Sequence, residues 1–439
     1  MSRELEGLRF FIHTFGCQMN ENDSHHIAGL LESAGAAQAA GPEAADILLV
    51  NTCAVRKKSE EKFFSYLGRL SGLKTRRGAL IGVLGCAAQV YKERLFARNR
   101  HIDLIAGPGE YARLVEGLAQ ARSAPCVMTG LSRAWTETGP QVLPEKAASA
   151  FVTIMEGCDN FCSYCIVPFS RGREKSRPFK NILDEVRVLT EKGVREIQLL
   201  GQNVNSYRDP ETGRGLPELL DALEPLPGLL WIRFITSHPK DFGPDLVEAV
   251  KRNRKVCRQV HLPLQSGSTD VLRRMNRGYS REEYLELAAA LRRAVPEMLL
   301  STDIIVGFPG ETEADFRATC EVLERVRFAS IFSFRYSPRP YSAAARLEDD
   351  VPLAVKRRRL VELQQLQKSI QLEFHRSLVG RQLEVLCSGP SPRGRGRYAG
   401  RTEGGQVVNF DCPEDRSGSF VRVLVTGCGP YSLHGRAVS

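Results

Sequence analysis

The chain has 439 residues, 42% hydrophobic and 26% charged, with twelve cysteines and a formal net charge of +10 at pH 7. No apolar run approaches the roughly 18 residues of a membrane helix, and the polar start lacks a signal-peptide core, so we expect a soluble, cytoplasmic protein whose cysteines serve metal or redox chemistry. The length indicates two to four domains, and the basic charge suits either a nucleic-acid partner or a merely basic surface.

Apolar runs and amphipathic segments alternate along residues 7–125, which predicts an open parallel α/β sheet. The expected strands are Arg9–Thr14, Asp46–Asn51, Ala79–Leu84 and Ile102–Ala106. The expected helices are Asp23–Ala34, Lys58–Leu70, Ala87–Arg98 and Glu110–Ala119.

Three cysteines of this domain occupy equivalent places. Cys17, Cys53 and Cys86 each follow the carboxyl end of an expected strand, where open α/β sheets bind their ligands. Their convergence would make a three-cysteine site. Since cysteine is also a common small buried hydrophobe, the spacing alone leaves a metal site and inert packing equally open.

Residues 126–148, with scattered Ser, Pro, Gly and Thr, are expected to be a linker. Residues 149–376 then contain six strand–helix units, too few to close an eight-stranded barrel, so we expect a partial (β/α)6 barrel. Its expected strands are Phe151–Met155, Glu196–Leu200, Trp231–Ile235, Val256–Leu262, Leu299–Val306 and Ser330–Phe334. Its expected helices include Leu183–Lys192, Asp245–Lys251, Arg281–Ala294, Glu313–Val326 and Val355–Arg376.

The loop after the first barrel strand carries Cys158, Cys162 and Cys165. Three thiolates at this spacing can bind three irons of a [4Fe-4S] cluster and leave the fourth iron open, as a reactive cluster needs. The alternatives are a zinc knuckle or core thiols. No fourth cysteine or histidine at short spacing completes a tetrahedral zinc site.

Polar loops follow the other barrel strands on the same carboxyl-end face. Amides, hydroxyls and glycine backbone there suit a polar small molecule with a ribose and an amino-acid end. The candidate cofactor-binding residues are Gly201, Gln202, Asn203, Ser237, Gln265, Ser266, Gly267, Asp303 and Gly307. His238 and His261 are as well explained as histidines at the edge of the core, and neither is assigned as an acid or base.

Residues 377–438 contain short β-prone runs, which predict a small antiparallel β-barrel of the oligonucleotide-binding kind. The runs are Gln382–Cys387, Gly396–Gly400, Gln406–Phe410 and Phe420–Thr426, with Gly404 and Gly405 as a hairpin turn. Arg393, Arg395 and Arg397 beside Tyr398 suit phosphate contact and base stacking. A structural barrel with an ordinary basic loop is the alternative.

Together these motifs resemble the radical S-adenosylmethionine (SAM) methylthiotransferase family over nearly the whole chain. The central three-cysteine motif is that of the superfamily, and Gly16-Cys17, Asn51-Thr52-Cys53 and Gly85-Cys86 narrow the resemblance to the methylthiotransferases, with a C-terminal TRAM domain. The stretches Cys17–Asn20, Cys53–Arg56 and Arg401–Phe410 are most similar to the tRNA 2-methylthio-N6-dimethylallyladenosine synthases. One departure is Tyr341–Ala345, where the family often has Gly-Thr-Pro-Ala-Ala.

The resemblance implies a radical SAM [4Fe-4S] cluster on Cys158, Cys162 and Cys165, and an auxiliary [4Fe-4S] cluster carrying sulfide or persulfide on Cys17, Cys53 and Cys86. Two SAM molecules would be used per turnover, one to methylate the sulfur and one to generate a 5′-deoxyadenosyl radical. The reaction would convert N6-isopentenyladenosine at position 37 of tRNA to its 2-methylthio form.

The implied partners are the tRNA anticodon stem-loop and a low-potential electron donor such as flavodoxin or ferredoxin, and we expect a monomer. Three alternatives remain open. The same chemistry acts on threonylcarbamoyladenosine in tRNA or on a ribosomal-protein aspartate in related branches, and a cluster- or zinc-stabilised RNA-binding protein would have no activity.

Overall fold

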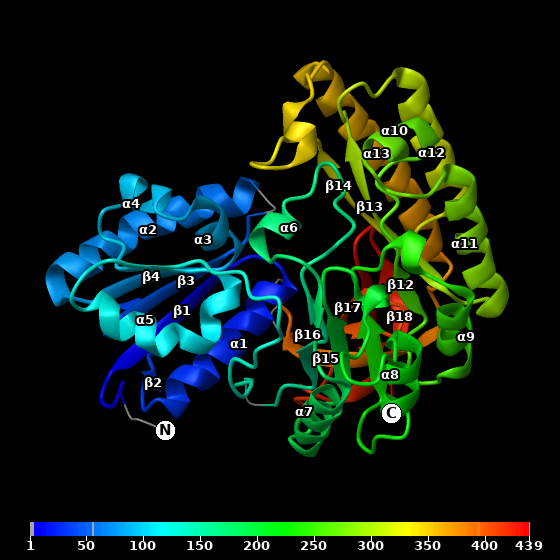
Figure 1. Cartoon of the computed structure of the whole chain (residues 1–439). Coiled ribbons are helices and arrows are strands. Elements are labelled where there is room, and N and C mark those ends of the chain that lie inside the picture. The colour runs from blue at the N-terminus through cyan, green and yellow to red at the C-terminus, as the bar shows by residue number, and fades with distance from the viewer. Residues whose placement is uncertain (1–3, 55–56, 145, 393, 395, 439) are drawn as a thin grey trace.

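A computed structural model describes residues 4–54, 57–144, 146–392, 394 and 396–438, without the side chains of residues 57–61. The chain forms an N-terminal sheet domain, a central barrel domain and a small C-terminal barrel (Figure 1). No helix in this described part combines the length and apolar character that crossing a bilayer requires. Arg393 and Arg395 lie outside the described residues.

The N-terminal domain is a six-stranded, fully parallel sheet in the order β2-β1-β3-β4-β5-β6, which confirms the predicted class. β3 is buried along its whole length, because apolar clusters cover both faces of the sheet. The strands are β1 (Arg9–Phe15), β2 (Ala37–Gln38), β3 (Ile47–Thr52), β4 (Leu80–Leu84), β5 (Leu104–Ala106) and β6 (Cys126–Met128). The helices are α1 (Gln18–Ser33), α2 (Lys57–Arg77), α3 (Cys86–Tyr91), α4 (Arg94–Arg98) and α5 (Leu114–Ala121).

Two details of this domain differ from the sequence-based expectation. The single helix expected over Ala87–Arg98 is two helices, α3 and α4, because the backbone turns at Lys92, which has a φ of +48°. Cys126–Met128, at the start of the expected linker, is the sixth strand and pairs with β5. A three-residue strand carries too little pattern to be recognised without its partner.

The central domain holds two three-stranded parallel sheets, β11-β10-β7 and β12-β13-β14, joined by a bridge between Ile232 and Val256. Within the described residues β14 and β7 do not pair, so the barrel is partial, as predicted. Its strands are β7 (Ser149–Thr153), β10 (Glu196–Leu200), β11 (Trp231–Phe234), β12 (Gln259–His261), β13 (Leu299–Val306) and β14 (Ser330–Arg335). A short ribbon pairs β8 (Met155–Glu156) with β9 (Lys175–Ser176).

Helices cover the outside of this barrel and enclose one large apolar core (Figure 1). The helices are α6 (Val167–Ser170), α7 (Phe179–Glu191), α8 (Leu216–Leu223), α9 (Pro244–Arg252), α10 (Thr269–Arg274), α11 (Arg281–Ala294), α12 (Glu313–Val326) and α13 (Leu353–Arg376). Short 3-10 turns are η1 (Pro42–Ala44), η2 (Pro108–Arg113), η3 (Val204–Ser206), η4 (Pro239–Asp241) and η5 (Ala343–Arg346).

The C-terminal strands close into a barrel in the order β15-β16-β17-β19-β18. The expectation of a wholly antiparallel barrel fails at one place, where β17 and β19 pair in parallel. An odd number of strands cannot alternate in direction all the way around a closed ring. The strands are β15 (Gln382–Pro390), β16 (Arg397–Thr402), β17 (Val407–Asp411), β18 (Phe420–Cys428) and β19 (Leu433–Ala437), the last of which was not predicted.

This small barrel is fixed to the amino-terminal end of the central barrel. The guanidinium of Arg233 donates hydrogen bonds to the carbonyl oxygens of Glu403 (2.6 Å) and Thr402 (2.8 Å), and to the carboxylate of Glu196 (2.8 Å). The rings of Trp231 and Phe420 meet edge to face with centroids 4.6 Å apart. These buried contacts close the barrel at the end opposite to its polar loops.

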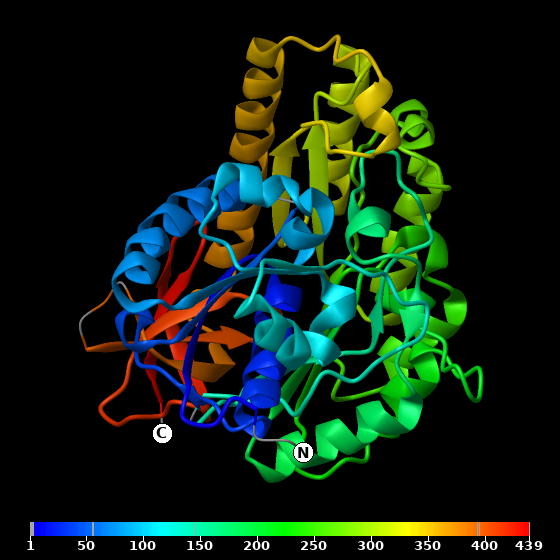
Figure 2. The same cartoon turned by 60° about the vertical axis from the view of Figure 1, so that its left-hand side comes forward.

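The N-terminal domain packs through α1 against β7, the edge strand of the central barrel. Figure 2 shows the two domains from a second direction. The Asn22 amide donates to Thr153 Oγ1 of β7 (2.8 Å). Gln141, in the segment between the domains, donates to both Asn22 and the carbonyl oxygen of Phe151. These contacts hold the carboxyl end of the N-terminal sheet beside the carboxyl end of β7.

Candidate active site

The first cysteine trio lies at the carboxyl ends of three strands that are neighbours in the sheet. Cys17 caps α1 directly after β1, Cys53 follows β3, and Cys86 begins α3 after β4. The Cys53 thiol hydrogen-bonds to Cys17 and, with the charge of Arg171, lowers the pKa of Cys17 to about 5. Burial raises the pKa of Cys86, which Arg171 also contacts. The structure thus brings the three predicted thiols together.

Two buried asparagines hold this trio in place. The Asn20 amide donates to Asn51 Oδ1 (3.0 Å), and the Asn51 amide donates back to the carbonyl oxygen of Asn20 (2.9 Å). Asn20 Oδ1 in turn accepts from the backbone N–H and the thiol of Cys17, each at 3.4 Å. Both residues belong to the motifs quoted above, and through Asn20 the pair fixes the position of Cys17.

The second trio lies on the loop between β8 and α6. Burial raises the pKa of Cys158 to about 11 and of Cys165 to about 12, and the nearby Cys162 adds to both shifts. The backbone N–H of Val167 points to Cys165 Sγ at 3.4 Å. Each thiol therefore lies within electrostatic reach of another in a site with little water, where bound iron and hydrogen-bond donors would stabilise thiolates.

Gly157 allows the sharp turn that opens this loop. It has a φ of +77°, and a Cβ there would lie 2.1 Å from the carbonyl oxygen of Arg173. Its N–H donates to Gln202 Oε1 (2.6 Å), so Gln202, a candidate cofactor-binding residue, holds the loop. Gly172 also has a positive φ of +82°, but a Cβ there meets only the side chain of Leu131 at ordinary contact distance.

A Gly157→Ala variant is therefore expected to lose about 2–5 kcal/mol of unfolding free energy, because backbone strain and overlap with fixed backbone add together. Gly172→Ala is the matched control and should lose about 1–2 kcal/mol from the strain alone. Urea unfolding of both variants measures the difference. Equal losses would show that the close approach at Gly157 relaxes without cost.

Arg277 and His238, which the sequence did not single out as functional, lie against Cys162. Arg277 is 4% exposed, and its guanidinium lies 3.3 Å from Cys162 Sγ and also donates to the carbonyl oxygen of Pro263 (2.8 Å). His238 Nδ1 accepts from the backbone N–H of Lys240 (3.3 Å), which leaves Nε2 as the N–H that faces Cys162 Sγ at 4.0 Å. Burial lowers the pKa of His238 to about 2, so the ring is neutral.

Several of the candidate cofactor residues present polar atoms without partners. Ser237 Oγ and Asn203 Oδ1 are buried and, within the described structure, have no hydrogen-bond partner. Gly201 lies against Met155, whose sulfur would be 2.5 Å from a Cβ at this position. Asp303 lies on the inner face of β13, with its carboxylate 3.5 Å from His261 Nε2. Orphaned polar atoms in a buried site fit a polar ligand.

The other candidate cofactor-binding residues form hydrogen bonds within the protein that fix the conformation of their loops. The Gly267 N–H donates to Thr319 Oγ1 of α12 (2.9 Å), and Ser266 Oγ lies 3.5 Å from the same hydroxyl. Gln265 has a φ of +71°, and its N–H donates to the carbonyl oxygen of Asp303 (2.8 Å). The Gly307 N–H donates to the buried carboxylate of Glu311 (2.8 Å). Their contacts within the protein are with helices and neighbouring strands.

A buried contact joins the two trios. Ile166, the residue after Cys165, packs in one apolar cluster with Ala54, Cys86 and Val90, so α6 lies against α3 (Figure 1). Arg171, at the end of α6, donates to Asp23 of α1 (2.5 Å) and to Glu156 of β8 (3.1 Å). This arginine was not predicted as a functional residue, because its partner Asp23 is 148 residues away in the sequence.

Neither cysteine trio is arranged to hold a single metal ion. Among the residues that the structure describes, no three His, Cys, Asp or Glu side chains converge enough to hold one metal ion. A cubane cluster does not require such convergence, since each of its irons takes a separate thiolate. Three thiols per site, with N–H donors beside the sulfurs, fit this kind of group.

Comparison with solved structures shows the fold. The radical S-adenosylmethionine methyltransferase TsrM from Kitasatospora setae, with cobalamin and a [4Fe-4S] cluster bound, aligns with a TM-score of 0.57 at 14% identity over 90% of this chain and 82% of that one. The cobalamin-dependent S-adenosylmethionine radical enzyme OxsB aligns with a TM-score of 0.55 at 12% identity, over 83% of this chain and 56% of that one.

Family models match all three domains. Residues 9–107 match the uncharacterized protein family UPF0004, residues 152–323 the radical SAM superfamily, and residues 376–438 the TRAM domain. Proteins named tRNA-2-methylthio-N(6)-dimethylallyladenosine synthase match nearly end to end. That of Chlorobium luteolum is 48% identical over 98% of this chain and 97% of its own length, and that of Pelodictyon phaeoclathratiforme is 46% identical over 98% of each. The chain therefore belongs to the tRNA-2-methylthio-N(6)-dimethylallyladenosine synthase family of radical SAM methylthiotransferases.

Proposed function

We propose that this protein inserts a methylthio group at C2 of N6-isopentenyladenosine (also called N6-dimethylallyladenosine) at position 37 of tRNA. The observation that carries the proposal is that the two cysteine trios lie close together at the boundary between the N-terminal and central domains. There Ile166 packs with Cys86, and Arg171 forms an ion pair with Asp23 and contacts Cys86. Sulfur insertion needs a place to hold sulfur beside a place that activates the substrate carbon. Two adjacent trios supply both.

In this proposal Cys158, Cys162 and Cys165 hold the radical SAM [4Fe-4S] cluster, and Cys17, Cys53 and Cys86 hold the auxiliary one. When bound, the first cluster with SAM supplies the removal of a hydrogen atom from an aromatic C2–H, which no side-chain base of near-neutral pKa could deprotonate. Arg277 and His238 donate toward Cys162 Sγ and stabilise its thiolate. Ser237 and Asn203 offer their unpaired oxygens to the polar ends of SAM.

The substrate is the anticodon stem-loop of a tRNA. Unpaired bases next to the anticodon can be splayed out of the stack, and TRAM-type barrels combine basic and aromatic side chains for RNA. Arg401, Arg422 and Arg436 are exposed on the barrel strands, in keeping with phosphate contact. We further propose that the protein acts as a cytoplasmic monomer, with electrons from flavodoxin or ferredoxin.

The alternatives are less well supported. The relatives named above are synthases of the dimethylallyladenosine type, which does not favour threonylcarbamoyladenosine or a ribosomal-protein aspartate as the substrate. A zinc- or cluster-stabilised binding protein without activity would have no use for a second trio packed close to the first.

The test is a single-turnover assay with anaerobically reconstituted protein, SAM, a chemical reductant and a synthetic anticodon stem-loop. Nucleoside mass spectrometry should find 2-methylthio-N6-isopentenyladenosine, and metal analysis should find about eight irons with matching sulfide per chain. Product on a threonylcarbamoyladenosine stem-loop instead, or about one zinc and no iron, would refute the proposal.

A further inference from the structure

Strand β14 presents two phenylalanine rings to the inside of the partial barrel. Phe332 is 51% exposed and Phe334 is 39% exposed. The alternate residues face the other way, because Ser333 Oγ accepts from Gln364 of α13 (3.1 Å) and Ile331 packs on the main core. Large apolar side chains that are exposed on an inner face, while the alternate residues Ile331 and Ser333 are partly buried on the outer face, indicate a site for a ligand.

Polar groups border this apolar surface. In the sheet register Asp303 of β13 lies beside Phe332, and the ring of His261 approaches Phe332 with centroids 5.9 Å apart. His261 contacts Ser301 Oγ through Nδ1 (3.0 Å) and the Asp303 carboxylate through Nε2 (3.5 Å). The phenylalanine rings can therefore contact a hydrocarbon group of a ligand, while His261 and Asp303 can form hydrogen bonds with the ring nitrogens of a base.

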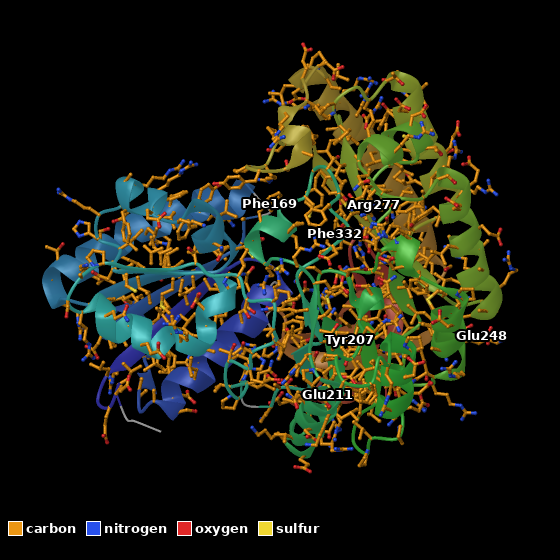
Figure 3. The ribbon with its side chains drawn as sticks, in the orientation of Figure 1. Phe169, Tyr207, Glu211, Glu248, Arg277 and Phe332 are labelled. Atoms are coloured by element: carbon orange, nitrogen blue, oxygen red, sulfur yellow. The ribbon has the colours of Figure 1, made fainter. Side chains whose placement is uncertain are left out.

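The same surface is continuous with the candidate active site. Ile305 lies beside Phe334 in the register. Ile305 and Tyr164, which precedes Cys165, both pack against one small apolar cluster that includes Phe308. Phe332 and Arg277 are labelled in Figure 3, in the region between the N-terminal domain and the outer helices of the barrel. A base seated on β14 would thus lie next to the loop of the second trio.

We propose that Phe332 and Phe334 contact the branched N6-dimethylallyl chain of the flipped-out adenosine, with His261 and Asp303 at its polar edge, and thereby select this substrate. The inference rests on the proposed function and adds its specificity-determining residues. An apolar five-carbon chain gains from burial against two rings. A threonylcarbamoyl group would place its carboxylate on those rings and beside the carboxylate of Asp303, which is unfavourable.

The experiment compares binding of the reconstituted holoenzyme, without reductant, to fluorescent stem-loops that carry either N6-isopentenyladenosine or adenosine. The wild-type protein should prefer the isopentenyl form by roughly ten- to hundredfold, as expected for burying several methylene groups. Phe332→Ala and Phe334→Ala together should bring this ratio close to one. Phe332→Leu should retain most of it, since the apolar contact survives. Phe169→Ala, a similarly exposed phenylalanine on α6, should keep the full ratio.

A double alanine variant with the wild-type preference, or a wild-type protein without preference, would overturn the inference. The methylthiolation assay separates this failure from failure of the function. If wild-type protein forms the methylthio product but the double variant retains its preference, only the specificity assignment is wrong. If wild-type protein forms no such product, the proposed function itself fails.

Discussion

A Cys86→Ala variant is expected to lose methylthiolation completely while it still cleaves SAM to 5′-deoxyadenosine. Cys86 begins α3 in the N-terminal domain, whereas the second trio lies on a loop of the central domain. The supporting contacts of that loop come from Gln202, Arg277 and Val167. Loss of one thiol should therefore remove the sulfur-holding site alone. Liquid chromatography with mass spectrometry measures both products, and iron should fall from about eight to about four per chain.

Cys126→Ala is the matched control for this variant. Cys126 is also a buried cysteine of the same sheet, but it lies on β6, where its thiol contacts the side chain of Gln120 at 3.4 Å. This control should keep both products and the full iron content. If Cys86→Ala still methylthiolates, or if both products disappear together, the assignment of sulfur holding to the N-terminal trio and SAM cleavage to the central trio is wrong.

The order and type of the main elements could be predicted because their patterns are local. Continuous apolar runs predicted β3 and β4, and amphipathic segments predicted α11 and α12 with the bounds that the structure has. β2, β6, β9 and β19 were missed, since strands of two to five residues are stabilised by a neighbouring strand that the local pattern does not show. The N-terminal cysteine trio was predictable because the carboxyl ends of neighbouring parallel strands meet at one edge of a sheet. The second trio was predictable because its three cysteines lie on one short loop.

The residues around the sulfurs could not be predicted in the same way. Arg171, Arg277 and His238 carry no motif of their own, and each acts through a contact that only the folded chain creates. The departure at Tyr341 is a further case. Its φ of +66° is a conformation that suits glycine, so the loop keeps a glycine-like turn at some cost in strain. Its ring lies 5.8 Å from that of Phe169, a contact that offsets part of this cost.

Replacement of Arg171 by methionine is expected to lower the free energy of unfolding by about 3–5 kcal/mol, because it leaves an uncompensated buried carboxylate. The Arg171 side chain is 3% exposed and that of Asp23 is 7% exposed, so water cannot replace the lost partner. Burial already raises the pKa of Asp23 to about 6, although Arg171 acts in the opposite direction. Urea unfolding measures the total loss, and hydrogen exchange in α1 and α6 locates it at the domain boundary.

Arg173→Met is the control, since Arg173 lies on the same loop but is 58% exposed, and its ion pair with Asp159 faces solvent. It should cost no more than about 1 kcal/mol. A second variant, Arg171→Met with Asp23→Leu, should recover most of the loss, because the buried carboxylate is removed with its partner while Glu156 keeps its ion pair with Lys175 at 3.2 Å. If the double variant is no more stable than Arg171→Met, the cost arises from lost packing of the arginine stem. In that case the pair with Asp23 is not what holds the two trios together.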